Sequence, residues 1–137
     1  MAIFSAQGLS TAPLRNILDE GLYVVNITKS EAIFSGKGTP GISFESVVEQ
    51  GPIQTQTQLS PMGRRFSWTL WVPNEGAGRN IGLQRLAKLC KVMDIDRTDD
   101  LDLDQFVGRQ VIVQIAHEDY NGEPQERANN FRKVGQE

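Results

Sequence analysis

Alternation of apolar and polar side chains in short segments is the feature that most constrains how this chain can fold. The clearest example is Gly21–Phe34, which is rich in β-branched residues and carries Tyr23, Val25 and Ile27 at every second position. A period of two is the pattern of a strand with one buried face. By the same pattern we predict further strands at Ile42–Glu49, Arg64–Val72, Gly108–Asp119 and Arg127–Val134.

One segment follows a helical period instead. Apolar side chains at i, i+3, i+4 and i+7 predict an amphipathic helix from about Ile81 to Met93, with Asn80 as its N-cap. Its apolar face consists of Leu83, Leu86, Ala87 and Cys90. The opposite face carries Arg85, Lys88 and Lys91, and positive charge near the end of a helix suits the helix dipole.

The predicted order is therefore three strands, one helix and two strands. A five-stranded Greek-key barrel is the architecture of the OB-fold, and here the helix falls between the third and fourth strands. We predict a mainly-β, single-domain OB-fold barrel spanning residues 1–137, with a core at about 20–134 and an N-terminal arm at 1–19. The helix is expected to plug one end of the barrel through Leu83, Leu86 and Cys90. In an OB-fold the loops after strands one and four contact ligands, and these loops are residues 35–41 and 120–126 here.

No pattern typical of a catalytic, metal or cofactor site occurs in the sequence. His117 has no cysteine near it, and a general base needs a partner held in hydrogen-bond reach. Gly36–Gly41 matches the pattern G-x-G-x-x-G. A dinucleotide site needs this motif between a strand and a helix, whereas here it joins two predicted strands. The run that starts at Asp94 has Asp99 and Gln105 where an EF-hand loop needs glycine and glutamate. We therefore predict a non-enzymatic protein with no metal and no cofactor.

Composition limits the expected compartment. The first residues lack the basic region and apolar run of a signal peptide, and no later stretch has the length of a membrane span. The single cysteine, Cys90, allows no intramolecular disulfide and fits a reducing compartment. A cytoplasmic protein with no membrane partner is expected.

Charge is unevenly distributed along the chain. The formal net charge is −3, which by itself argues against a phosphate-rich ligand. However, six aspartates lie within residues 94–104, where Arg97 is the only base. The remaining residues carry 13 basic and 11 acidic side chains. We expect a basic surface elsewhere, with the acidic run pointing away from any bound nucleic acid.

Aromatic and basic side chains are interleaved on two of the predicted strands. Bases stack on exposed aromatic rings for about 1–3 kcal/mol each, while Lys and Arg contact phosphates. Trp68 shares a strand face with Phe66 and Leu70, so a role in the core stays open for it, whereas Trp71 lies on the opposite face. The predicted nucleic-acid-binding residues are Lys37, Arg64, Arg65, Trp68, Trp71, Tyr120, Arg127, Phe131, Arg132 and Lys133.

Several loose motifs occur in a characteristic order over about residues 20–134. They are a V-x-x-G corner at Val48–Gly51, an aromatic strand, a helix, D-x-x-x-x-x-G-[KR] at Asp102–Arg109 and Y-N-G at Tyr120–Gly122. In this order the chain resembles small bacteriophage single-stranded DNA-binding proteins. The resemblance implies an OB-fold that coats intermediates of phage DNA replication or recombination in the infected bacterium, with phage or host replication proteins as partners. It leaves homo-oligomerisation open.

The chain departs from that pattern at its end. Many single-strand binders finish in an acidic tail with a hydrophobic tip that recruits partners, whereas this sequence ends FRKVGQE. The resemblance therefore does not carry over recruitment of partners through such a tail.

Two alternatives stay open. A non-enzymatic β-barrel module that binds protein or sugar, such as a structural component of a virion, would share the fold. A small hydrolase or nuclease would need converging carboxylates or a histidine pair, and the clustered carboxylates lie on a predicted loop at residues 94–104. Salt distinguishes the first alternative, because a DNA binder loses affinity steeply as salt rises.

Overall fold

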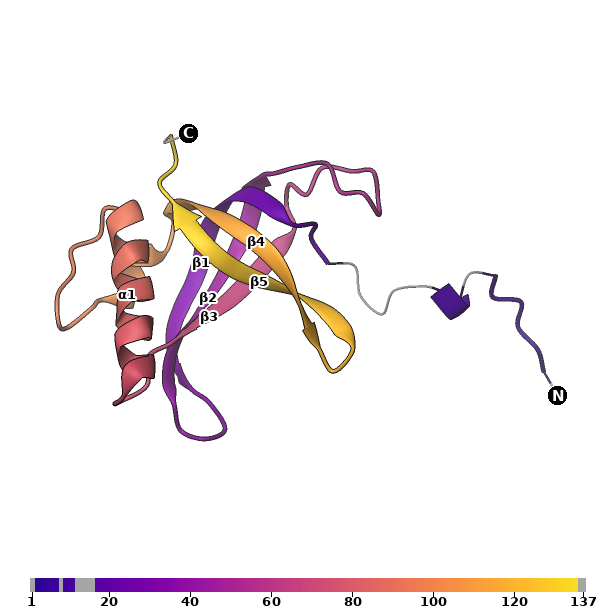
Figure 1. Ribbon diagram of the computed structural model, residues 1–137. Helices are drawn as coiled ribbons and strands as arrows, with labels where there is room; N and C mark the ends of the chain where they lie inside the picture. Colours follow the sequence, from indigo (N-terminus) through magenta and orange to yellow (C-terminus); the bar gives the residue numbers. More distant parts are fainter. Residues whose placement is uncertain (1, 8, 12–16, 136–137) are drawn as a thin grey trace.

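Five β-strands and one α-helix make up the described part of the chain (Figure 1). The computed structural model describes residues 2–7, 9–11 and 17–135. The predicted mainly-β class, with its helix between the third and fourth strands, is confirmed. No helix in these ranges is long and apolar enough to cross a membrane. The elements are η1 (Leu9–Thr11), β1 (Gly21–Phe34), β2 (Pro40–Gln50), β3 (Arg65–Trp71), α1 (Ala77–Val92), η2 (Leu103–Phe106), β4 (Gln110–Tyr120) and β5 (Glu123–Arg132).

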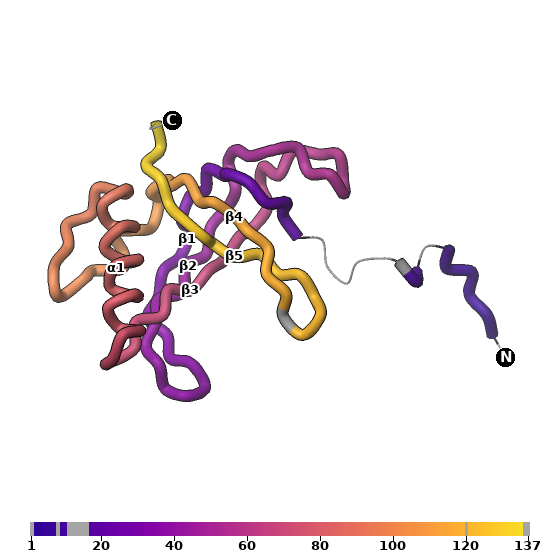
Figure 2. The backbone as a smooth tube through the Cα atoms, in the orientation of Figure 1, coloured from indigo at the N-terminus to yellow at the C-terminus, as the bar shows by residue number. Residues whose placement is uncertain are grey.

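The strands form one antiparallel sheet in the order β3, β2, β1, β4, β5. The central strand β1 is long enough to pair with both neighbours: Gly21 to Asn26 pair with β4, and Val24 to Phe34 pair with β2. The register of β1 against β2 shifts twice, and such irregularities bend a strand and increase its twist. The sheet therefore curls, which brings its edge strands β3 and β5 round toward each other (Figure 2). Residues of both strands line one cleft.

The curled sheet does not close into the predicted Greek-key barrel. In the described part of the chain, β3 and β5 are not hydrogen-bonded to each other and form the two edges of the sheet. Side chains bridge the gap instead, with the ring centroids of Trp68 and Phe131 lying 5.7 Å apart. A bulge at Asn129, which has no Cα partner on β4, also interrupts the regular β5 edge that closure would need.

The core lies inside the curl of the sheet, where the predicted alternation places it. Tyr23, Val25 and Ile27 of β1 are fully buried. On β3 the burial alternates in the same way, so that Phe66, Trp68 and Leu70 point inward and the intervening side chains point outward. Packing of β-branched and aromatic side chains from the concave face therefore holds the sheet together.

Helix α1 begins at Ala77 and not at the predicted Ile81. Its N-cap is Gly76, with a φ of 83° and no capping hydrogen bond from a side chain, so Asn80 is an interior residue of the helix. The segment before Asn80 is glycine-rich, and glycine has a low helix propensity, which is why we expected a loop there. Packing against the end of β3 overrides this propensity.

The buried face of α1 also differs from the predicted one. Gly82 and Cys90 are buried, whereas Leu83 is 40% exposed. A Cβ on Gly82 would lie 2.3 Å from the carbonyl oxygen of Trp71, so only glycine permits this close contact between helix and strand. The contact turns Gly82 toward the sheet in place of Leu83. The predicted plug through Leu83, Leu86 and Cys90 is therefore wrong for Leu83, while Leu86 is half-buried against the core.

The β4–β5 hairpin is tighter than predicted. Its strands are joined by Asn121 and Gly122 alone, whose φ angles of 53° and 83° are the two positive values that a type I′ turn requires. Tyr120 is therefore paired with Glu123, and β5 runs over Glu123–Arg132 instead of the predicted Arg127–Val134. The Asn-Gly pair indicated this turn. The residues that follow it are polar and show no apolar alternation, so the sequence did not indicate that β5 starts there.

The long connection between β2 and β3 is anchored by Gln54, which is 2% exposed. Its Nε2 donates a hydrogen bond to the Tyr23 hydroxyl at 2.9 Å, and its Oε1 accepts one from the backbone N–H of Asp19 at 2.7 Å. Burial raises the pKa of the Tyr23 phenol above its ordinary value.

Leu18 is fully buried, so residues 17–19, which we assigned to the N-terminal arm, belong to the packed body.

Candidate nucleic-acid interface

The open edges of the sheet face each other across a cleft of about 480 Å³. Ser67–Trp71 of β3 form one wall, and Gln125–Phe131 of β5 form the other. Arg85 and Lys88 of α1 and Glu118 of β4 also line the cleft. The cleft therefore exists because the sheet is curled but not closed.

Backbone groups of β3 point into this cleft. At the two ends of the β2–β3 ladder, the N–H of Val48 donates to Arg64 and the N–H of Val72 donates to Pro40. Hydrogen-bonded and non-hydrogen-bonded pairs alternate along an antiparallel ladder, and this ladder has no register shift. The N–H and C=O groups of Ser67 and Thr69 are therefore directed away from β2. They are available to a ligand that lies along β3.

Trp71 is the aromatic residue of β3 that can offer a ring face to a ligand. Trp71 is 42% exposed and is one of the residues that line the cleft. The indole lies directly over Gly41 of the neighbouring strand, because a Cβ on Gly41 would be 2.6 Å from the ring. Glycine at position 41 thus allows the ring to lie against the sheet while remaining half-exposed.

Trp68 and Phe131, which we predicted as contact residues, are core residues that form the floor of the cleft. They are only 7% and 5% exposed. The Trp68 ring stacks at 5.2 Å from Phe44 and 5.6 Å from Phe66. Since both faces of such a ring are already covered by protein, neither residue can stack on a base without repacking. The alternative core assignment for Trp68 is therefore the correct one.

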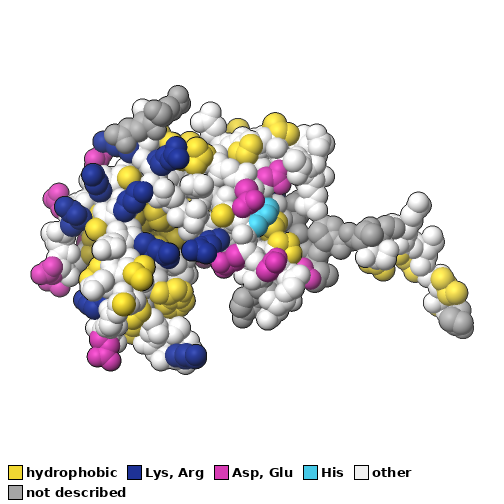
Figure 3. Space-filling view, in the orientation of Figure 1, with side chains coloured by type: hydrophobic (Ala, Val, Ile, Leu, Met, Phe, Trp, Pro, Cys, Tyr) yellow, Lys and Arg dark blue, Asp and Glu magenta, His cyan; other side chains and the backbone are white. Residues whose placement is uncertain are grey.

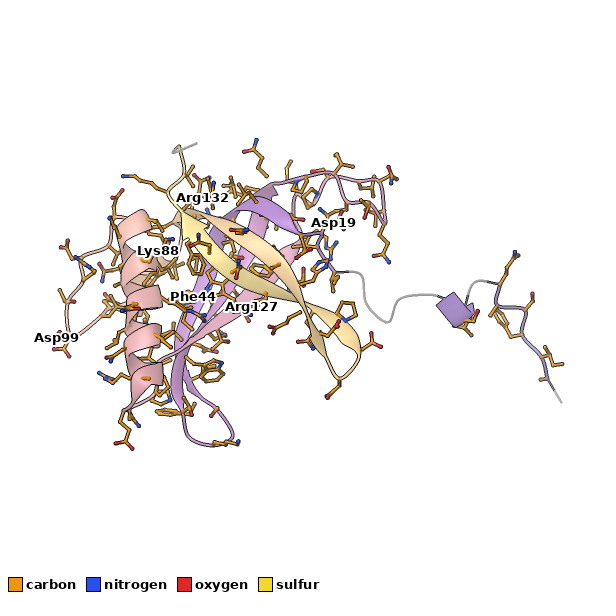
Figure 4. All side chains as sticks on the ribbon, viewed as in Figure 1. Asp19, Phe44, Lys88, Asp99, Arg127 and Arg132 are labelled. Atoms are coloured by element: carbon orange, nitrogen blue, oxygen red, sulfur yellow. The ribbon has the colours of Figure 1, made fainter. Side chains whose placement is uncertain are left out.

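The cations of the cleft come from α1 and β5. Arg127 pairs with Glu118 at 3.2 Å, but both side chains are about half-exposed, and pairs of this kind contribute little to stability. Lys88 Nζ donates to Asn130 Oδ1 at 2.5 Å, a neutral partner that leaves the ammonium charge uncompensated. Figure 4 shows Lys88 between α1 and β5, with Arg127 and Arg132 on β5. These charges can meet phosphate groups at the mouth of the cleft.

A second depression, which we call the basic hollow, lies between α1 and β5. Its volume is about 600 Å³, and it shares Lys88, Asn130 and Phe131 with the cleft. Among the residues that the structure describes, no Asp or Glu lines it. Figure 3 shows Lys and Arg side chains gathered over this part of the surface. The cations that line it are Lys88, Lys91, Arg97, Arg132 and Lys133.

The structure brings six of the ten predicted binding residues to these two depressions and leaves Lys37, Arg64 and Arg65 outside them, while the tenth, Tyr120, has no described side chain. Lys37 is exposed in the β1–β2 turn, and Arg64 is half-buried just before β3. Arg65 points to the outer surface beside Thr28 and Glu45. Tyr120 ends β4, and its side chain lies outside the described part of the chain. The six residues at the depressions are Trp68, Trp71, Arg127, Phe131, Arg132 and Lys133.

Sequence reasoning missed the contribution of the helix and of Arg97. Arg85, Lys88 and Lys91 recur at every third position of α1, and we interpreted them only as a solvated face that suits the helix dipole. Their spacing was the available signal, since residues three apart on a helix share one side. Arg97 carried no signal, because it stands alone among aspartates.

The groups most often used in catalysis have structural roles here. The Nε2 atom of His117 lies 2.6 Å from the carbonyl oxygen of Leu18, and its backbone N–H donates to Glu20. Cys90 is buried, and this burial raises the pKa of its thiol, which disfavours the reactive thiolate. Among the described residues, no group of three or more His, Cys, Asp or Glu side chains could hold a metal ion.

Comparison with known proteins adds no identification. No protein-family profile matches the chain, and no curated protein sequence matches it. The resemblance to bacteriophage single-stranded DNA-binding proteins therefore stays a prediction.

Proposed function

We propose that this protein binds single-stranded DNA in the cleft between β3 and β5 and catalyses no reaction. The observation that carries the proposal is that the half-exposed Trp71 and the cations Arg85, Lys88 and Arg127 are among the residues that line one cleft. A stacking platform next to cations is the arrangement that holds single strands with little sequence preference. The backbone groups of Ser67 and Thr69 add hydrogen-bonding capacity along the same wall.

The proposed site favours a single strand over a duplex. A base can stack on Trp71 only if its π-face is free, and in a duplex the bases are stacked on one another. Because every base has such a face, the stacking contact does not depend strongly on sequence. The cations contact the phosphodiester backbone, which is the same for all sequences.

We also propose that the sheet is an OB-fold left open between β3 and β5. The strand order, the position of α1 between β3 and β4, and the antiparallel pairing of β1 with both β2 and β4 support this assignment. The OB-fold is a partly open Greek-key barrel, so an open edge is compatible with it. With the resemblance noted above, the fold favours a role in phage DNA replication or recombination in the cytoplasm of the host.

One observation favours the alternative of a protein-binding module. The open β3 edge directs the backbone of Ser67 and Thr69 into the cleft, and an extended peptide can pair with such an edge. Hydrogen bonds between a peptide backbone and the β3 edge join uncharged groups, so they depend little on salt. DNA binding releases counterions from phosphates and therefore weakens as salt rises. The two functions therefore differ in their dependence on salt.

The test is a titration with oligothymidine at several salt concentrations, followed by tryptophan fluorescence. We expect quenching as a base stacks on Trp71, weak or absent binding of a duplex, and a linear fall of log K with log salt. Each phosphate contact adds about −0.7 to that slope, so three to five contacts would give a slope of about −2 to −3.5. Binding that is equal for duplex and single strand, or independent of salt, would contradict the proposal.

A further inference from the structure

The basic hollow between α1 and β5 has a charge that the protein itself does not neutralise. Of its five cations, only Lys133 forms an ion pair within the described residues, with Asp94 at 3.1 Å. Lys91 and Arg132 are exposed and have no carboxylate partner in that part of the chain. Like charges held this close repel one another, so an anionic ligand would relieve the repulsion.

The hollow is a continuation of the cleft. Lys88, Asn130 and Phe131 belong to the walls of both depressions, so a strand that leaves the cleft along β5 passes directly into the hollow. The chemistry changes at this point. Within the described part of the chain, the only aromatic residue that lines the hollow is the buried Phe131, so no exposed ring of these residues is available there for a base.

We propose that the basic hollow binds the phosphodiester backbone of the strand whose bases stack in the cleft, and that Asp94 competes with that backbone for Lys133. This inference rests on the proposed function, and it adds a second contact region on α1. The hollow recognises phosphate charge alone, while the cleft contacts both phosphates and a base. A strand long enough to span both regions binds more tightly than one that fills only the cleft.

Asp94 is fixed in a position to compete. It follows the end of α1 with a φ of 57°, and its backbone N–H donates to the carbonyl oxygen of Lys91. Arg109 Nη1 holds the preceding carbonyl of Met93 at 2.9 Å. These contacts fix the backbone of Asp94 so that its carboxylate lies 3.1 Å from Lys133, on the rim of the hollow, where it would compete with an incoming phosphate. Our expectation that the acidic run points away from bound nucleic acid does not extend to Asp94.

The first experiment compares strands of two lengths and a strand without bases. Oligothymidines of about 4 and about 12 nucleotides bracket the reach of one such domain. Lys91→Ala and Arg132→Ala should each weaken the longer strand and flatten its salt slope by about 0.7, while leaving the shorter strand almost unchanged. An abasic deoxyribose-phosphate oligomer should respond to these two variants but not to Trp71→Ala.

The matched control is Lys29→Ala. Lys29 is an exposed cation on β1, is paired with Glu31 at 3.6 Å, and lines neither depression. It should not alter binding of either strand. If Lys91→Ala and Arg132→Ala bind the longer strand and the abasic oligomer as the unchanged protein does, the inference is overturned, although oligothymidine binding in the cleft stands. If the unchanged protein binds oligothymidine no more tightly than the abasic oligomer, and Trp71→Ala weakens neither, the proposed stacking function fails instead.

The second experiment uses two substitutions that remove the same charge. Asp94→Asn should strengthen binding of the longer strand by about two- to fivefold, because it frees Lys133. Asparagine tolerates the left-handed backbone at this position, so the variant introduces no strain. Asp99→Asn changes net charge equally, but Asp99 lies on the loop beyond α1 (Figure 4) and should have a much smaller effect. Equal effects of the two substitutions would exclude specific competition by Asp94.

Discussion

Replacement of Trp68 with alanine is expected to lower the free energy of unfolding by about 3–5 kcal/mol, the usual cost of removing a large aromatic side chain from a core. The Trp68 ring lies among Phe44, Phe66 and Phe131, with centroid separations of 5.2 Å to 5.7 Å. Its removal would leave a cavity beneath the cleft that three aromatic rings could fill only by moving. Urea unfolding followed by circular dichroism measures the loss.

Trp68→Phe serves as the control for this prediction. Phenylalanine keeps an aromatic ring in place and removes the indole Nε1, which is buried without a hydrogen-bond partner among the described residues. Removing an unsatisfied donor offsets part of the lost packing, so the expected cost is below about 1.5 kcal/mol. A loss of stability for Trp68→Ala as small as that for Trp68→Phe would show that this ring does not support the core.

Replacement of Trp71 with alanine should have the opposite effect, a large loss of affinity with a small loss of stability. Affinity for oligothymidine is expected to fall by about 1–3 kcal/mol, while the salt slope stays the same because no phosphate contact is lost. The ring is 42% exposed, so stability should fall by at most about 1–2 kcal/mol. Fluorescence anisotropy of a labelled oligothymidine at several salt concentrations measures both the affinity and the slope.

Trp71→Tyr is the matched variant, because it keeps an aromatic face over Gly41. It should retain most of the affinity that Trp71→Ala loses. The stacking assignment would be wrong if Trp71→Ala bound oligothymidine as tightly as the unchanged protein. It would also be wrong if the loss of affinity came with a flatter salt slope, since that would indicate a phosphate contact.

The strands were predictable because burial on one face leaves a local pattern. β1 spans Gly21–Phe34 as the alternation predicts, and the placement of Phe66, Trp68 and Leu70 on one face of β3 follows from the same period. The same alternation puts Trp71 on the outer face. What the pattern did not settle was which face would be covered, and that depends on the strand pairing across the whole sheet.

The helix and the hairpin show where local patterns fail. The contact of Gly82 with the backbone of β3 determines which face of α1 is buried. This contact requires a residue without a side chain, so the periodicity of apolar side chains does not reveal it. The start of β5 was obscured because Glu123 and Gln125 are polar on an exposed edge. Edge strands with two solvated faces carry little hydrophobic signal.

The candidate site was predicted in part. Trp71 and Arg127 could be found from the interleaving of aromatic and basic residues on strands. The spacing of Lys88 and Lys91 indicated a shared side of the helix, but their part in the site depends on α1 lying beside β5, a contact between segments about 40 residues apart in sequence. The sequence also did not predict that the barrel stays open, although this opening creates the cleft on which the proposed function depends.

The most direct test of the central claim, that single-stranded DNA lies between β3 and β5, is a titration of the nitrogen-15-labelled protein with oligothymidine, followed by amide chemical shifts. We predict that the largest shifts occur at Ser67, Thr69 and Trp71 on one wall, at Asn129 on the other, and at the Trp71 indole N–H. Shifts confined to the outer surface of β1 and β4, around Leu22 and Ile112, with the β3 and β5 amides unmoved, would contradict the account.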